Sequence, residues 1–217
     1  MQQKLIKIAL IGKTNAGKST LINVLVGEKI SIVNKKINTT QEFIIGIKNK
    51  NNTQIIFYDT PGSNFLKTSS LSQKKLKTNL WQSIDSVDCL IYLIDVMKYD
   101  FKEIKKDILK IAEVTKPIIL VFNKIDLIDN KRILPMIKEL KKINKINEFF
   151  LISAKKNNGI DNFLNFLLSK SHIHQWFYKD NEITDKDDIY ISNECTRNAI
   201  LKYMHQEIPY NIKIINE

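Results

Sequence analysis

The sequence predicts an α/β fold in which a mostly parallel sheet is covered by helices on both faces. Apolar runs of strand length alternate with helical stretches along residues 1–169, and such alternation is typical of parallel strands joined by helices. The apolar runs are nearly continuous, as expected of strands buried on both faces. Two strands with no helix between them, within residues 43–58, are expected to form one antiparallel pair.

Each element is predicted from the pattern of its own residues. A strand is expected where apolar residues run together, and a helix where a longer stretch with helical character separates two such runs. In chain order, these patterns predict a strand at 5–11, a helix at 18–26, strands at 43–48 and 53–58, a helix at 68–84, a strand at 88–95, a helix at 101–114, a strand at 117–123, a helix at 131–143, a strand at 149–152 and a helix at 159–168.

The last part of the chain has a different organisation. Residues 170–184 show no helical period and are expected to form a linker that wraps the surface. Asp185 can then cap a helix over 187–206, followed by a short strand at 210–215. One helix and one strand cannot form a core alone. The predicted organisation is a main domain at 1–169, a linker at 170–184 and an incomplete second domain at 185–217.

Charge is distributed unevenly along the 217 residues. The net charge of +11 divides into +13 for residues 1–169 and −2 for residues 170–217. Such an excess invites a nucleic-acid interpretation. However, only two of the 34 basic residues are arginine, and the abundance of Lys, Ile and Asn indicates an AT-rich coding sequence as much as selection for phosphate contacts. The lysine clusters at 74–77, 105–106 and 141–142 are interpreted as solvated helix faces, with phosphate contact as the alternative.

Several classes of protein are disfavoured by composition. There is neither an apolar run of about 18 residues nor an N-terminal signal-peptide pattern, which favours a cytoplasmic location. Cys89 and Cys195 suit reduced thiols rather than a disulfide framework. The histidines have no cysteine partners at ligand spacing, so histidines of a surface linker are favoured over a metal site for His172 and His174.

A glycine-rich loop lies between the first predicted strand and helix. Residues 12–19 have the pattern G-x-x-x-x-G-K-[ST], and we call them the phosphate loop. In this pattern, backbone N–H groups and the helix N-terminus surround the α- and β-phosphates of a nucleotide. Lys18 is expected to reach the β/γ-phosphates, and the Ser19 hydroxyl to ligate Mg²⁺. The predicted nucleotide contacts in this region are Gly12, Lys13, Thr14, Asn15, Ala16, Gly17, Lys18, Ser19 and Thr20.

The sequence Asp59-Thr60-Pro61-Gly62 follows a second apolar run, so its carboxylate lies at the C-terminal tip of a strand, where α/β sheets bind ligands. Asp59 can hold Mg²⁺, through water, and the Gly62 N–H can meet a γ-phosphate. Thr60 and Pro61 are counted among the nucleotide contacts. The alternative is a strand followed by a Pro-Gly turn.

A third motif, Asn123-Lys124-Ile125-Asp126, indicates which nucleotide base the site binds. The Asp126 carboxylate can accept hydrogen bonds from guanine N1–H and N2–H₂, a donor pair that adenine lacks, so GTP is predicted over ATP. Asn123 is expected to tie loops together and touch N7, while the Lys124 stem packs along the base. After another apolar run, Ser153-Ala154-Lys155 is expected to supply a backbone N–H to guanine O6.

A polar stretch between the phosphate loop and Asp59 contains Asn38-Thr39-Thr40-Gln41. A threonine in such a loop can complete the Mg²⁺ shell while the γ-phosphate is present. This metal-binding role is assigned to Thr40, with Thr39 as the alternative. The competing interpretation is a threonine pair that starts the next strand.

With these motifs in this order, the chain resembles the translation-factor-related GTPases and, more narrowly, the Era family of bacterial ribosome-assembly GTPases. The resemblance extends to Trp176-Phe177-Tyr178, Ile183-Thr184-Asp185 and Glu207-Ile208-Pro209-Tyr210, which are similar to the family's interdomain linker and the start of its KH domain. It implies a P-loop GTPase domain followed by an incomplete KH-like α+β segment. It also implies GTP/GDP and Mg²⁺ as ligands, and a K⁺ ion held with the help of Asn15 in place of an arginine finger.

The resemblance further implies a monomer that acts on the small ribosomal subunit and its rRNA, with peripheral association with the inner membrane. The chain departs from the family pattern at four points. Thr14 replaces the usual proline, Gln41 replaces an arginine, and Ser63 is neither the glutamine of Ras-like proteins nor a hydrophobic residue. In addition, no G-x-x-G loop, which grips RNA in KH domains, follows the linker.

The predicted mechanism is a slow GTPase switch in which Lys18, Thr40 and Gly62 stabilise the charge that develops on the phosphates. No residue is a credible general base. One alternative is a GTP-binding remnant of a truncated gene with RNA binding lost. Another is a GTPase of tRNA modification or large-subunit assembly, which the linker and the Pro209-Tyr210 segment disfavour.

Overall fold

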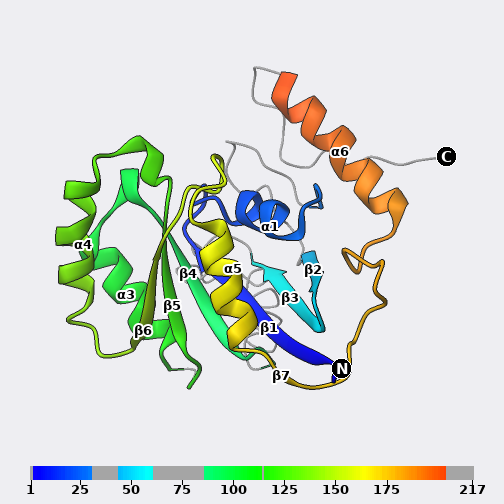
Figure 1. Ribbon diagram of the computed structural model, residues 1–217. Helices are drawn as coiled ribbons and strands as arrows, with labels where there is room; N and C mark the ends of the chain where they lie inside the picture. The colour runs from blue at the N-terminus through cyan, green and yellow to red at the C-terminus, as the bar shows by residue number, and fades with distance from the viewer. Residues whose placement is uncertain (1, 31–43, 61–85, 114, 204–217) are drawn as a thin grey trace.

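The computed structural model describes residues 2–30, 44–60, 86–113 and 115–203 (Figure 1). The described elements are β1 Lys4–Gly12, α1 Lys18–Val26, β2 Ile44–Lys50, β3 Thr53–Asp59, β4 Cys89–Asp95, α3 Phe101–Ile111, β5 Ile118–Asn123, α4 Ile133–Leu140, β6 Ile146–Leu151, α5 Ile160–Ser169, β7 His172–Ile173 and α6 Asp188–Tyr203, with short 3₁₀ helices η2 Val96–Lys98, η3 Ile125–Leu127 and η4 Asn130–Arg132.

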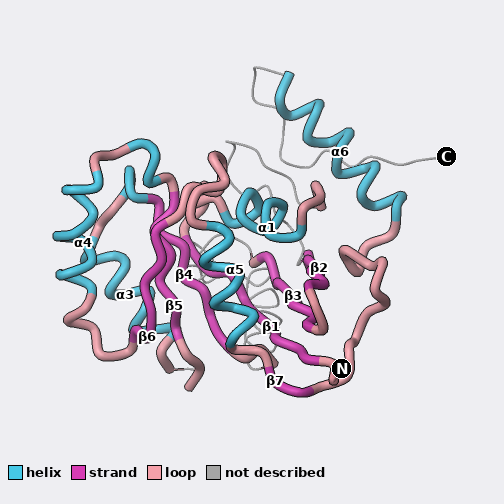
Figure 2. Tube along the Cα trace, in the orientation of Figure 1, coloured by secondary structure: helices cyan, strands magenta, loops and turns pink. Residues whose placement is uncertain are grey.

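The strands form one sheet in the order β2-β3-β1-β4-β5-β6, with β7 paired to β1 outside this path (Figure 2). Within this order, the four pairs β3-β1, β1-β4, β4-β5 and β5-β6 are parallel. β2 is antiparallel to β3, and β7 is antiparallel to β1. The predicted mostly parallel sheet and its antiparallel pair within 43–58 are therefore confirmed.

Helices cover both faces of this sheet, as predicted (Figure 1). Successive residues of β1 point to opposite faces. Ile8 and Leu10 belong to the hydrophobic cluster that includes residues of α1 and α5, whereas Ala9 and Ile11 belong to the cluster that includes residues of α3 and α4. All four side chains are buried, which explains why the strand is apolar at every position.

Several boundaries differ from the prediction. The helix expected at 131–143 is divided into η4 and a shorter α4, and the helix expected at 101–114 ends at Ile111. β6 begins at Ile146, earlier than predicted. The helix predicted at 68–84 lies outside the described residues. Among the residues that are described, no helix combines the length and the apolar content needed to cross a membrane.

The C-terminal helix α6 is capped by Asp187 and not, as predicted, by Asp185. The Asp187 side chain accepts a hydrogen bond of 2.7 Å from the backbone N–H of Tyr190, three residues later, which is the spacing that a capping side chain requires. Asp185 instead accepts a bond of 3.3 Å from the N–H of Ile45 in β2. The end of the predicted helix and the strand predicted at 210–215 lie outside the described residues.

Residues 174–185, which we call the strap, follow the edge of the sheet beside β2 and β3. The anchor of the strap is Gln54, a fully buried side chain in β3. Its Oε1 atom accepts bonds of 3.0 and 3.1 Å from the N–H groups of Phe177 and Tyr178, and its Nε2 atom donates a bond of 3.0 Å to the Tyr178 carbonyl. Further along, the Ile47 N–H donates to the Ile183 carbonyl at 2.8 Å.

Replacing Gln54 with methionine, which has similar volume, is expected to lower the free energy of unfolding by about 1–3 kcal/mol because three backbone groups of the strap lose their partner. Urea unfolding would measure this change. Gln175→Met is a suitable control, since Gln175 is exposed on the same strap. An unchanged unfolding midpoint in Gln54→Met would show that the amide contributes nothing to holding the strap.

Candidate functional site

The candidate site lies at the C-terminal ends of the parallel strands. The loop after β1 reaches α1 at Lys18, β3 ends at Asp59, β4 ends at Asp95, and β5 ends at Asn123. The strand register sets Asp59 opposite Leu10 and Asp95 opposite Asn123. The sheet therefore gathers these polar residues at one edge, where ligands bind in open α/β folds.

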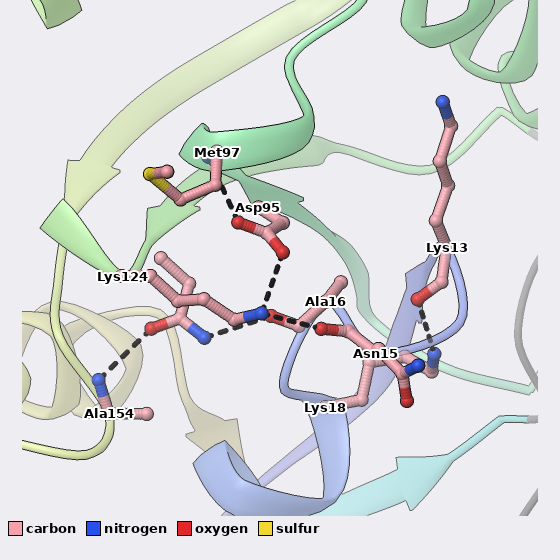
Figure 3. Close-up of polar contacts among 9 residues, drawn as sticks. Lys13, Asn15, Ala16, Lys18, Asp95, Met97, Lys124 and Ala154 are labelled. Atoms are coloured by element: carbon pink, nitrogen blue, oxygen red, sulfur yellow. Dashed lines mark hydrogen bonds and ion pairs between the residues drawn. The ribbon is translucent and has the colours of Figure 1, made fainter. Parts of the chain in front are cut away.

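The phosphate loop closes around its own lysine (Figure 3). Lys18 Nζ donates to the carbonyl oxygens of Gly12 and Lys13 at 3.1 and 3.2 Å, and the side chain is buried. Burial lowers the pKa of Lys18, and the nearby negative charge of Asp59 partly opposes this shift. An ammonium group in this position has lost much of its hydration, so an incoming phosphate oxygen would restore a strong charged partner.

Asp59 and Ser19 lie together beside the loop. The Ser19 hydroxyl donates to Asp59 Oδ2 at 2.8 Å, and Asp59 is fully buried. A hydroxyl and a carboxylate supply the oxygen ligands that Mg²⁺ takes when phosphates complete its shell, so this pair fits a magnesium nucleotide. Thr60 donates its hydroxyl to the Leu10 carbonyl at 2.5 Å, which uses its one side-chain donor, so only its backbone N–H could donate to a phosphate.

Asn123 joins the phosphate loop to the loop after β6. Its Nδ2 atom donates to the Ala16 carbonyl at 2.9 Å, and its Oδ1 atom accepts from the Ala154 N–H at 3.0 Å. Gly17 lies directly against this amide, because a Cβ atom added there would meet Asn123 Nδ2 at 2.4 Å. Gly17 also has a φ of 101°, a conformation that favours glycine.

Replacing Gly17 with alanine is therefore expected to weaken nucleotide binding by about 10- to 100-fold, which corresponds to roughly 1–3 kcal/mol of backbone strain and steric conflict. Equilibrium titration with a fluorescent guanine nucleotide would measure the change. Gly27→Ala is the matched control, because Gly27 caps the other end of α1 with a φ of 93° and a Cβ atom there would meet only Lys48 Nζ, at 3.5 Å. Equal losses in both variants would contradict the role given to the Gly17 contact.

Lys124 reaches across to the phosphate loop. Its Nζ atom donates to the Asn15 carbonyl at 2.8 Å and to Asp95 Oδ2 at 2.6 Å (Figure 3). Two residues later, Asp126 lies exposed in η3, where its carboxylate is accessible to a ligand. The N–H of Lys124's neighbour Ile125 donates to the Ile152 carbonyl at 3.3 Å, which holds this loop beside the one that follows β6.

The tripeptide Ser153-Ala154-Lys155 begins a tight turn after β6. Ser153 and Asn158 exchange backbone hydrogen bonds of 3.0 and 3.1 Å. Ser153 and Ala154 are buried, while Lys155 is exposed. The turn is thus positioned by Asn123 and by its own backbone, with the Lys155 side chain directed to solvent.

Some predicted site residues lie outside the described part of the chain. These are Thr40 with its alternative Thr39, and Pro61 and Gly62 after Asp59, together with Gln41 and Ser63 at two of the points where the sequence departs from the family pattern.

Two residues that touch the site were not among the predicted ones. Asp95 binds Lys124, and Glu103 in α3 forms an ion pair with Lys13 of the phosphate loop. Asp95 ends an apolar run in the same way as Asp59, which predicts its place at this edge of the sheet, but the sequence does not show its contact with Lys124. Nothing in the sequence singles out Glu103 among the charged residues of α3.

Comparison with known proteins identifies the family. The model of the family described as "50S ribosome-binding GTPase" matches residues 7–124. GTPase Era of Ehrlichia ruminantium (strain Gardel) is 35% identical over 209 residues, which cover 96% of this chain and 70% of the relative. The chain belongs to the Era family of GTPases. GTPase Era of Rickettsia bellii (strain OSU 85-389) gives a similar result, with 35% identity over 99% of this chain and 72% of the relative.

Solved Era structures agree with this family. The crystal structure of Era in complex with MgGDPNP and nucleotides 1506–1542 of 16S ribosomal RNA has a TM-score of 0.85 and 32% identity, and the match covers 95% of this chain and 70% of that one. A variant of Aquifex aeolicus Era bound to GDP·AlF₄⁻ has a TM-score of 0.84 and 31% identity over the same shares. The Era-family chain is therefore a GTPase that uses guanine nucleotide with Mg²⁺.

Proposed function

We propose that this Era-family GTPase is a slow molecular switch in the assembly of the small ribosomal subunit. The observation that carries the proposal is the extent of the likeness to Era, which covers 95% of the chain and so extends beyond the nucleotide motifs into the strap and α6. The relative in that comparison is bound to a fragment of 16S ribosomal RNA, the RNA of the small subunit. The family description that names the 50S subunit matches only residues 7–124, so it supports the nucleotide domain without favouring either subunit.

The residue roles in this proposal follow from position and chemistry. Lys18 binds the β- and γ-phosphates and, with Thr40 and the Gly62 N–H, stabilises charge as the terminal phosphate leaves. Ser19, Thr40 and Asp59 hold Mg²⁺, which when bound neutralises phosphate charge. Asp126 recognises guanine, and the backbone at Ser153, Ala154 and Lys155 meets its O6 atom.

Turnover is expected to be slow because no side chain in the proposal acts as a general base. Intrinsic GTPases of this kind turn over at roughly 10⁻⁴ to 10⁻² s⁻¹. We also propose that Asn15 helps to hold a K⁺ ion that replaces an arginine finger. Hydrolysis measured in potassium and in sodium salts of equal ionic strength tests this point, since equal rates would exclude the ion from the mechanism.

The proposed organisation is a GTP-binding domain at 1–169, a linker at 170–184 and a KH-like segment at 185–217. A second candidate function comes from the glycine content of the last part. No glycine follows Gly159, so the G-x-x-G loop that grips RNA in KH domains is absent from these residues. The alternative is that residues 1–217 bind guanine nucleotide without engaging RNA. A cytoplasmic location, a monomeric state and membrane association stay predictions from sequence.

The deciding experiment measures whether the purified chain, loaded with a non-hydrolysable GTP analogue, binds small ribosomal subunits or the 3′ end of their RNA. Binding that is lost in the GDP state supports the assembly role. Intact affinity for GTP without any binding to subunits or RNA favours the alternative. Since contacts with phosphates weaken as salt rises, the measurement is repeated over a range of salt concentrations to separate specific from purely ionic binding.

A further inference from the structure

Asp95 is a buried carboxylate with both oxygens engaged. It ends β4, and its side chain is only 6% exposed. Its Oδ1 atom accepts a bond of 3.0 Å from the Met97 N–H at the start of η2, and its Oδ2 atom accepts a bond of 2.6 Å from Lys124 Nζ (Figure 3). The bond from the Met97 N–H fixes the orientation of the carboxylate. The oriented carboxylate then holds the Lys124 ammonium group through its second oxygen.

The lysine held in this way grips the phosphate loop. Lys124 Nζ also donates to the Asn15 carbonyl at 2.8 Å. Asn15 and Lys124 have φ values of 65° and 67°, so both adopt a left-handed conformation. Asparagine tolerates this conformation, whereas for a lysine it is unfavourable and persists where surrounding contacts impose it. The ammonium group of Lys124 links its own loop to the Asn15 carbonyl, and Asp95 holds the ammonium group beside that carbonyl.

Two further contacts of the phosphate loop can be compared with this one. The bond from Asn123 to the Ala16 carbonyl is between neutral groups. The ion pair of Lys13 with Glu103 has side chains that are 28% and 44% exposed, so water screens it. The contact through Asp95 joins two full charges, and although the Lys124 side chain is 31% exposed, the carboxylate is only 6% exposed. The carboxylate end of this pair is therefore shielded from water, and the geometry of Lys124 depends on it.

We propose that Asp95 is a positioning residue for nucleotide binding. Asp95 fixes Lys124 against the Asn15 carbonyl and thereby aligns the phosphate loop with residues 123–126, the loop that carries the guanine-reading Asp126. The inference rests on the proposed nucleotide site. Asp95 acts through Lys124 and touches neither the terminal phosphate nor the base-reading carboxylate of Asp126. Its loss therefore weakens GTP and GDP equally and leaves the preference for guanine over adenine unchanged.

The first test is Asp95→Asn, which keeps the shape of the side chain and its bond to the Met97 N–H but removes the charge. GTP and GDP affinities are expected to fall by the same factor, about 10- to 100-fold, which is typical for the loss of a charged hydrogen bond. In hydrolysis assays KM rises while kcat stays unchanged, because the lost contact stabilises ground state and transition state alike.

Asp100→Asn is the matched control. Asp100 is an exposed aspartate five residues further on, and its carboxylate caps α3 by accepting a bond of 3.0 Å from the Glu103 N–H. A variant that acted only through helix capping or general stability would behave like this control. Thermal unfolding of both variants without nucleotide shows whether the fold itself has changed.

A double-mutant cycle with Lys124→Met isolates the coupling between the two residues. If Asp95 acts through Lys124, the nucleotide dissociation rate of the double variant matches that of Lys124→Met alone. Additive effects overturn the proposal, as does nucleotide binding by Asp95→Asn that equals that of the unmodified chain. Failure of the unmodified chain to bind guanine nucleotide would instead overturn the nucleotide site on which the inference rests.

Discussion

Lys18→Ala is expected to abolish measurable binding of GTP and GDP. The ammonium group is buried inside the phosphate loop, where burial lowers its pKa. Truncating one partner of a buried charged contact costs about 3–5 kcal/mol, or roughly 10²- to 10⁴-fold in affinity. Isothermal titration with GDP and with a GTP analogue would measure the loss.

The same substitution is not expected to destabilise the nucleotide-free protein. The depressed pKa of Lys18 means that folding disfavours its charged form, so at neutral pH the buried charge opposes folding and its removal relieves this cost. Lys29→Ala provides the control, because Lys29 is exposed just after α1. Nucleotide binding by Lys18→Ala at the strength of the unmodified chain would refute the phosphate site, provided that the unfolding temperature shows an intact fold.

The sheet could be predicted from sequence because its determinants are local and redundant. Ile8, Ala9, Leu10 and Ile11 are all apolar since both faces of β1 are covered, and a continuous apolar run of this length is typical of such a strand. Helix ends were less predictable, because they depend on which of several similar residues makes the cap. Asp185 and Asp187 are equally good capping residues by sequence, and only the pairing of Asp185 with β2 decides between them.

The strand-loop-helix context of the phosphate loop could be predicted, because the motif is a fixed pattern of residues over one short stretch between β1 and α1. Asp95 and Gln54 were not predicted, because their roles depend on partners distant in sequence. In the sequence, Gln54 is a polar interruption in an apolar strand, and its importance follows only from the strap lying over it. Asp95 is likewise no more than the polar end of a strand until Lys124 is placed beside it.

Asp126→Asn is expected to change which base the site accepts. Guanine presents N1–H and N2–H₂ donors, and a carboxylate accepts both, whereas an asparagine amide offers one acceptor and one donor. Xanthine has an N1–H donor and a carbonyl in place of the amino group, so the amide matches it instead. A site built to pair such groups discriminates by up to about 10⁴-fold, so GTP affinity falls steeply and affinity for xanthosine triphosphate rises. Competition titrations with both nucleotides would measure the exchange.

Asp129→Asn is the control for this exchange of specificity. Asp129 lies exposed three residues further on, and its carboxylate accepts a bond of 2.9 Å from the Lys131 N–H, so its neutralisation changes local charge by the same amount without altering Asp126. If Asp126→Asn weakened guanine and xanthine nucleotides alike, the carboxylate would act on the stability of η3 rather than on the base. Retained preference for guanine would mean that the base is read elsewhere, and the turn at Ser153-Ala154-Lys155 would be the next position to change, since Asn123 holds it beside the phosphate loop.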